Sequence, residues 1–179
     1  FRAAGPSGAV LETDCPYLPP QSARGKRNEP RAIAEIAAKM ADVFRLLKIE
    51  RALVVVGASG EKNTSYVDEV SISGPTDVWD VKSGAVRRLR LEPRDFGVAS
   101  APISELRGGE TPEENARILR DIFSGKDKGP RRSAVLASAG AAFYISGATP
   151  DIEKGARKAA DLIDAGAVSE TLARLVELK

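Results

Sequence analysis

The chain has 179 residues, with 27 basic against 25 acidic side chains, a single cysteine and no histidine. This near balance of charge gives no general case for binding nucleic acid or a membrane, and the lack of histidine excludes a histidine-based triad or general base. The 42% hydrophobic content is enough for one core, so one α/β domain over residues 1–179 is expected.

Several features bear on where the protein works. Cys15 has no second cysteine to pair with, which favours a reducing, cytoplasmic setting. No run of 18 apolar residues and no signal-peptide pattern occurs. The chain begins at Phe1 rather than Met, which indicates that a preceding part has been removed or is missing.

The first expected elements are a long loop, a helix and a buried strand. Residues 7–30 are rich in proline and predict an irregular loop with a short strand over 9–11. Apolar positions then recur every three or four residues and predict a helix with one buried face: Ile33, Ile36, Ala37, Met40, Val43, Phe44 and Leu47. The run "RALVVVGASG" that follows is typical of a strand covered on both faces. Helix and buried strand in succession predict an α/β fold with a central, mostly parallel sheet that is flanked by helices on both faces.

The next section predicts short strands. "EVSISG", "TDVWDV" and "AVRRLRL" are separated by Gly74-Pro75 and by Ser83-Gly84, which indicates a small antiparallel element around 78–91. The clusters at 24–27 and 87–90 are basic, and the simplest interpretation is a solvated loop and a solvated strand face.

Four helices are expected in the remainder of the chain. The first begins after Thr111 as N-cap and stops at Gly125. The others are expected over 131–147, over 152–165 and over 169–178.

Two adjacent acids, Asp68 and Glu69, stand where the short strands begin. Successive strand side chains point to opposite faces, so both acids can serve one ligand only if the chain turns there. They are either a solvated strand start or a small oxygen-ligand site for a cation such as Mg2+, and composition alone favours the first.

Two glycine-rich turns, "GASG" at 57–60 and "LRGGE" at 106–110, are candidates for phosphate cradles. Neither fits a known phosphate-binding pattern, so turns that need positive φ are the favoured interpretation.

The order of these segments resembles the carboxyl-terminal α/β part of anthranilate phosphoribosyltransferase, within a fold like that of the nucleoside phosphorylases and phosphoribosyltransferases. The resemblance rests on "RALVVVG", "VDEVSISGPTDVW", "DFGV", "GGETPEENARILRDIFSGKDKGPRRSAVL" and "DIEKGARKAADLIDAGAVSETLARL", and more thinly on Phe1 with Gly5-Pro6.

The resemblance implies that Asp68 and Glu69 are ligands of Mg2+, which neutralises the pyrophosphate of phosphoribosyl pyrophosphate in tryptophan biosynthesis. It implies no covalent protein nucleophile, so no catalytic residue is assigned. The family's glycine-rich pyrophosphate loop, its amino-terminal helical domain and its acceptor-binding arginine have no counterpart in the sequence. The substrate-binding residues therefore stay unassigned, and the chain resembles an incomplete part of the enzyme that is inactive alone.

Three hypotheses follow. The first is a part of an anthranilate phosphoribosyltransferase, whose homodimer contact would lie in the missing helical domain. The second is a related phosphoribosyltransferase or phosphorylase-like protein with another acceptor. The third is a non-catalytic remnant or interaction module that keeps the fold.

Overall fold

The computed structural model describes residues 24–25, 33–59 and 65–177. The chain divides into two compact units, Phe1–Glu92 and Pro93–Lys179. The single domain over 1–179 therefore stays a prediction. Of the loop expected over 7–30, only the turn at Arg24 and Gly25 lies within the described residues, and the short strand expected over 9–11 lies outside them.

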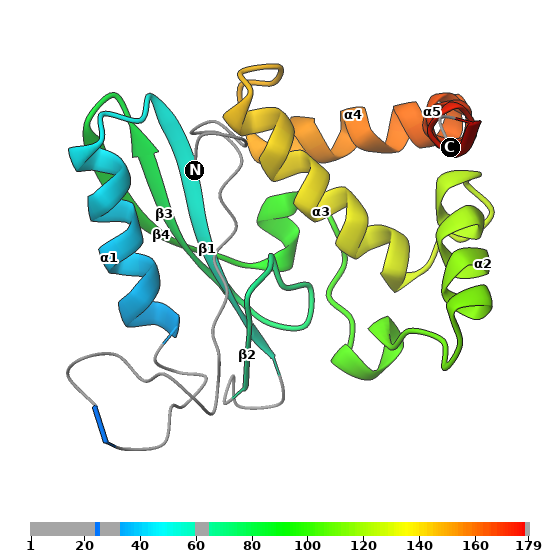
Figure 1. Ribbon diagram of the computed structural model, residues 1–179, viewed down its shortest axis with the longest axis horizontal. Helices are drawn as coiled ribbons and strands as arrows, with labels where there is room; N and C mark the ends of the chain where they lie inside the picture. The colour runs from blue at the N-terminus through cyan, green and yellow to red at the C-terminus, as the bar shows by residue number, and fades with distance from the viewer. Residues whose placement is uncertain (1–23, 26–32, 60–64, 178–179) are drawn as a thin grey trace. The chain divides into compact units, whose positions relative to one another are not determined.

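The first unit contains one helix and a four-stranded sheet (Figure 1). Its elements are α1 (Ile33–Leu46), β1 (Arg51–Ser59), β2 (Ser65–Val67), β3 (Thr76–Lys82) and β4 (Ala85–Leu91). The strands lie in the order β2-β1-β3-β4, so β2 and β4 form the two edges of the described sheet. The helix, β1, β3 and β4 were all expected from the sequence.

The strand directions correct the prediction of a mostly parallel sheet, because every pairing among the described strands is antiparallel. β3 and β4 form a hairpin whose two turn residues, Ser83 and Gly84, have φ of 49° and 81°. Parallel neighbours would need a crossover of about a dozen or more residues, usually a helix, and no described helix lies between β1 and β4. The uninterrupted apolar run of β1 reflects its burial, and burial does not determine the direction of a strand's neighbours.

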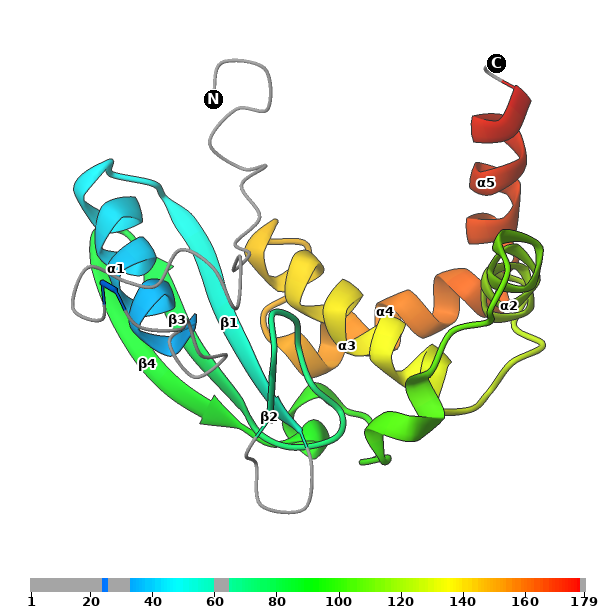
Figure 2. The ribbon, with the colours of Figure 1, turned by 60° about the horizontal axis from the view of Figure 1, so that its bottom comes forward.

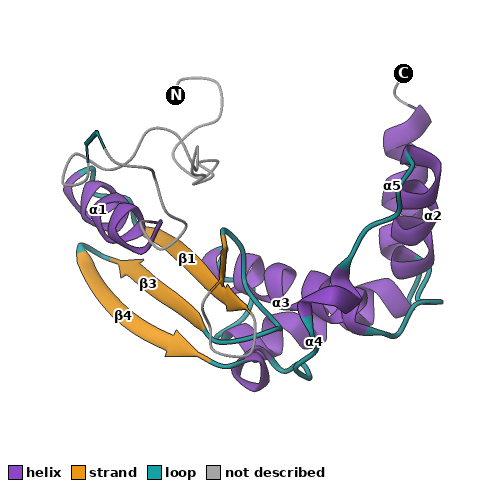
Figure 3. Ribbon diagram, turned by 90° about the horizontal axis from the view of Figure 1, so that it is seen from below, coloured by secondary structure: helices purple, strands orange, loops and turns teal. Residues whose placement is uncertain are grey.

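Helix α1 covers one face of the sheet, as Figures 2 and 3 show. Ala37 and Ala41, both 0% exposed, pack in one cluster with Val54, Val56, Trp79 and Val81. Met40 and Phe44 pack against this cluster, so the expected burial of Ala37, Met40 and Phe44 is confirmed, whereas Ala41 was not expected there. Val43 and Leu47 are 43% and 62% exposed, so their expected burial was wrong. Helices on the second face of the sheet stay a prediction.

The edge strand β4 carries three arginines whose side chains are more than half exposed. Arg87 pairs with Asp80 at 3.3 Å, and Arg88 and Arg90 pair with Asp77 at 3.8 and 3.4 Å. The guanidinium of Arg88 also lies 5.1 Å from the centre of the Trp79 ring. The interpretation of 87–90 as a solvated strand face is confirmed.

The second unit is helical. Two short 3-10 helices, η3 (Pro93–Phe96) and η4 (Ile103–Leu106), precede α2 (Pro112–Phe123), α3 (Pro130–Ile145), α4 (Ile152–Asp164) and α5 (Ala167–Glu177). Thr111 Oγ1 accepts from the backbone N–H of Glu114 at 3.2 Å, and Gly125 follows α2 with φ of 73°, so both predicted ends of this helix are confirmed. No described helix is long and apolar enough to cross a membrane.

The core of this unit is the contact between α3 and α4, which lie side by side in Figures 1 and 2. Gly140 and Gly155 are both buried at the crossing. The guanidinium of Arg132, whose side chain is only 7% exposed, bridges the two helices through Asp164 at 2.9 Å. Within the described part of the chain, the Nε of Arg132 is buried without a hydrogen-bond partner.

Candidate metal-binding loop

Asp68 and Glu69 lie at the start of the connection from β2 to β3, residues 68–75, which we call the acidic loop. The chain bends at both residues immediately after β2 ends at Val67, so it turns where a shared ligand would require it to turn. Both residues are exposed. The acidic pair is therefore available to solvent at one end of the sheet.

Gly57 of β1 determines how closely the acidic loop approaches the sheet. A Cβ placed on Gly57 would lie 2.6 Å from the backbone oxygen of Glu69 and 2.7 Å from Cβ of Ser71. Both distances are too short for any side chain, so glycine is needed there because of this contact. Gly57 is not among the residues with positive φ, so a positive-φ turn at this residue is not found, and Gly60 of the same predicted turn lies outside the described residues.

The far side of the acidic loop is fixed by buried hydroxyl groups. Ser71 Oγ donates to the carbonyl oxygen of Ala58 at 2.7 Å and accepts from the N–H of Ser73 at 3.0 Å. The N–H of Ser71 donates to Thr76 Oγ1 at 3.0 Å, and the N–H of Ala58 donates to the carbonyl oxygen of Pro75 at 2.7 Å. These bonds hold the loop against the end of β1.

The same bonds correct the prediction of a strand over 69–74, because the described chain has no strand between Val67 and Thr76. Serine and threonine hydroxyls compete with the ladder of a sheet by bonding to nearby backbone groups. Ser71 and Thr76 were not identified as anchors from the sequence. The signal was present in the run of serines and a threonine around Gly74-Pro75, which is typical of a turn.

The carboxylates of the pair are not engaged by a basic side chain within the described part of the chain. Neither Asp68 nor Glu69 takes part in an ion pair or a side-chain hydrogen bond within that part of the chain. Because both carboxylates are exposed, the pair can supply two hard oxygen ligands. No third potential metal-ligating side chain is grouped with them among the described residues. This fits Mg2+, which usually keeps several waters and substrate phosphate oxygens beside one or two carboxylates.

The backbone N–H groups of the second glycine-rich turn, at 106–110, are bonded by side chains of α2, the helix that follows it. Asn115 Oδ1 accepts from the N–H of Gly109 at 2.9 Å, and Glu114 Oε2 accepts from the N–H of Glu110 at 2.7 Å. These N–H groups are therefore used in starting α2 and not held free for a phosphate. Neither Gly108 nor Gly109 has positive φ, so the turn does not need glycine for that reason.

Comparison with known proteins places this fold and loop in a family. Residues 32–169 match the family described as glycosyl transferase family, a/b domain. The chain belongs to this family. The match includes α1, the whole described sheet with the acidic loop, and the helices as far as the start of α5.

Its relatives include many anthranilate phosphoribosyltransferases. The protein of that name from Hyphomonas neptunium is 42% identical over 137 residues, which is 76% of this chain and 38% of the relative. The one from Geobacter sp. strain M21 is 38% identical over 178 residues, which is 99% of this chain and 45% of the relative. The chain therefore spans less than half the length of these relatives.

Solved structures agree with the sequence relatives. Anthranilate phosphoribosyltransferase from Thermus thermophilus superposes with a TM-score of 0.67 at 36% identity, over 80% of this chain and 40% of the other. The enzyme from Saccharomyces cerevisiae in complex with PRPP and Mg superposes with a TM-score of 0.66 at 27% identity, over 80% and 39%.

A second family matches the beginning of the chain. Residues 2–56 match the family described as TatD related DNase. This match covers less than a third of the chain and overlaps the transferase match over residues 32–56.

Proposed function

We propose that this chain is part of an anthranilate phosphoribosyltransferase, in which the acidic loop binds the Mg2+ that accompanies phosphoribosyl pyrophosphate. The observation that carries the proposal is the exposed pair Asp68 and Glu69, not engaged by a basic side chain among the described residues, in a chain 38–42% identical to proteins of that name. The similar yeast structure with PRPP and Mg supports the same ligands. The setting that we propose is the cytoplasm.

The proposed reaction transfers the phosphoribosyl group from the pyrophosphate to the amine of anthranilate. When bound, Mg2+ stabilises the negative charge that develops on the departing pyrophosphate. The role of this chain is to hold the cation through the carboxylate oxygens of Asp68 and Glu69. Gly57 and Ser71 keep those carboxylates in place through the contacts described above. No covalent nucleophile is required, which agrees with a chain that has no histidine.

The remaining substrate contacts lie in the part of the relatives that this chain does not span. We propose that the acceptor-binding residues and the homodimer contact belong to that part, so this chain alone has little or no turnover.

The test measures binding rather than turnover, since the chain spans only part of its relatives. The melting temperature of the chain is followed while Mg2+ is titrated in the presence of phosphoribosyl pyrophosphate. We expect a rise for the parent, because a ligand that binds only the folded state stabilises it. Asp68→Ala and Glu69→Ala should lose that rise while melting as the parent does without Mg2+. Glu105→Ala, which removes an exposed acid from η4, is the matched control and should keep the rise.

Two outcomes would contradict the proposal. A parent chain that shows no Mg2+-dependent rise would favour a non-catalytic module. Loss of stability in Asp68→Ala or Glu69→Ala with an unchanged response to Mg2+ would show that the pair is structural.

A further inference from the structure

Two protein families meet within the first unit. Of the two family matches, only that of the DNase family covers residues 2–31, and only that of the transferase family covers residues 57–169. Their overlap, 32–56, contains α1, the connection to β1 and β1 as far as Val56. A helix followed by a buried strand is common in α/β proteins, so both families can match this stretch.

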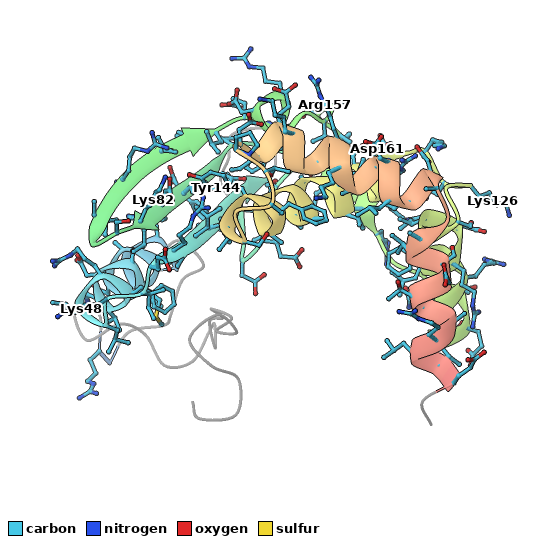
Figure 4. The ribbon with its side chains drawn as sticks, turned by 90° about the horizontal axis from the view of Figure 1, so that it is seen from above. Lys48, Lys82, Lys126, Tyr144, Arg157 and Asp161 are labelled. Atoms are coloured by element: carbon cyan, nitrogen blue, oxygen red, sulfur yellow. The ribbon has the colours of Figure 1, made fainter. Side chains whose placement is uncertain are left out.

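The connection from α1 to β1 has an unusual residue at the end of the helix. Two backbone bonds close the helix, from the N–H of Lys48 to the carbonyl of Arg45 at 3.1 Å and from the N–H of Ile49 to the carbonyl of Phe44 at 3.0 Å. This pattern normally has glycine at the left-handed position, but here the position is taken by Lys48, which is labelled in Figure 4. Its φ is 56°. Leu46 and Leu47 beside it are 69% and 62% exposed. The connection from α1 to β1 therefore departs from the usual sequence pattern of a helix end.

The contact between α1 and the sheet demands little specificity. The helix presents Ala37 and Ala41 to the sheet, and Met40 and Phe44 pack beside them. The two central alanines let the helix approach the sheet closely, so other helices with small residues at these two positions could cover this face.

We propose that the chain is a fusion of a segment from a TatD-related DNase with an α/β segment of the transferase family, joined at 47–50. In this arrangement α1 comes from the DNase segment, and its alanine stripe is the interface that covers the transferase sheet. The competing arrangement is a diverged transferase segment over the same residues, since the Geobacter relative aligns with 99% of the chain.

Two chimaeras of the full chain distinguish these arrangements. In one, residues 2–46 are replaced by the aligned stretch of a TatD-related DNase; in the other, by that of the Geobacter relative. Trp79 is the only tryptophan of the chain and is 6% exposed beneath α1, so its fluorescence reports whether a helix covers the sheet. We expect the DNase chimaera to melt within about 5 °C of the parent with a blue-shifted Trp79 emission, and the Geobacter chimaera to melt no higher. Ala41→Glu in the parent, which should red-shift the emission, shows that the assay senses the interface.

Loss of cooperative melting in the DNase chimaera would overturn the proposal, whatever the Geobacter chimaera does. A Geobacter chimaera that melts well above the DNase chimaera would overturn it too.

The joint itself is tested by mass spectrometry of cells that carry the gene. Cleavage after glutamate releases the peptide 36–50, which runs from α1 across the joint. We expect this peptide in one gel band together with peptides from 2–31 and from 57–179. Peptides of the two segments in two separate bands, without the bridging peptide, would refute a fusion.

Discussion

Gly140 of α3 and Gly155 of α4 meet backbone to backbone: a Cβ on Gly155 would lie 2.9 Å from the Cα of Gly140. A Cβ on Gly140 would lie 2.7 Å from the carbonyl oxygen of Ile152. The two helices can therefore pack at this distance only while both positions lack a side chain. The contact between α3 and α4 therefore requires glycine at both positions, since any other residue would place a Cβ there.

Gly140→Ala should lower the free energy of unfolding by about 1–3 kcal/mol, because the added methyl group meets backbone that cannot rotate away. Ser138→Ala, an exposed change on the same helix, should alter it by less than about 0.5 kcal/mol. Urea denaturation of both variants checks this, and equal stabilities would contradict the close contact.

Gly57→Ala should displace the acidic loop, since its methyl group would meet the backbone of Glu69 and the side chain of Ser71. We expect a loss of about 1–3 kcal/mol in stability. The response to Mg2+ with phosphoribosyl pyrophosphate should weaken as well. Ser65→Ala, at an exposed position of β2, serves as control. A stable Gly57→Ala variant with the parent's response would show that the loop does not depend on this contact.

Lys48→Gly should stabilise the protein by about 0.5–1 kcal/mol, because it relieves a left-handed conformation that costs a residue with Cβ roughly 1–2 kcal/mol. The same exchange inside α1, Lys39→Gly, should cost about 1 kcal/mol. Thermal melts should show a higher melting temperature than the parent for Lys48→Gly and a lower one for Lys39→Gly. A lower melting temperature for both variants would contradict the left-handed conformation of Lys48.

Acid should weaken α4 through two carboxylates. The N–H of Lys154 holds the pKa of Asp151 below its ordinary value of 3.8, and hydrogen bonds from Lys128 and then Arg132 lower the pKa of Asp164. A carboxyl group with a lowered pKa stabilises the fold fully above its unfolded value, and this contribution is lost as the pH falls through the folded pKa.

The double variant Asp151→Ala, Asp164→Asn should therefore melt below the parent at pH 6. The difference in melting temperature between the parent and the double variant should become smaller as the pH drops from about 4 downward. Asp161→Asn removes an exposed acid from the same helix (Figure 4) and should follow the parent throughout. A difference that stays constant with pH would mean that the two carboxylates do not titrate as argued.

The sequence predicted elements whose cause is local. Thr111 and Gly125 mark the ends of α2 through bonds and conformations within one helix, so the pattern alone identifies them. Strand direction depends on which segments pair, and a buried strand has the same apolar pattern in parallel and antiparallel sheets. That is why the sheet was predicted to be mostly parallel.

In the candidate site, too, local features could be predicted from the sequence and contacts between distant segments could not. The exposure of Asp68 and Glu69 follows from their type and position after a short strand. The role of Gly57 does not, because it comes from contact with residues more than ten positions further along the chain. The alternation of Val70, Ser71, Ile72 and Ser73 imitates a strand, while the bonds of Ser71 with Ala58 and Thr76 form only in the folded protein.

The arginines of β4 affect how copies of this protein behave together in solution. An edge strand offers unpaired N–H and C=O groups to which another chain can add a strand, and such addition begins many aggregates. Arg87, Arg88 and Arg90 are long, charged and mostly exposed along that edge of the described sheet. A second copy that added its own β4 there would bring like charges together and would strip water from them. The arginines therefore disfavour strand addition between copies, although the N–H and C=O groups on the outer side of β4 are unpaired within the described sheet.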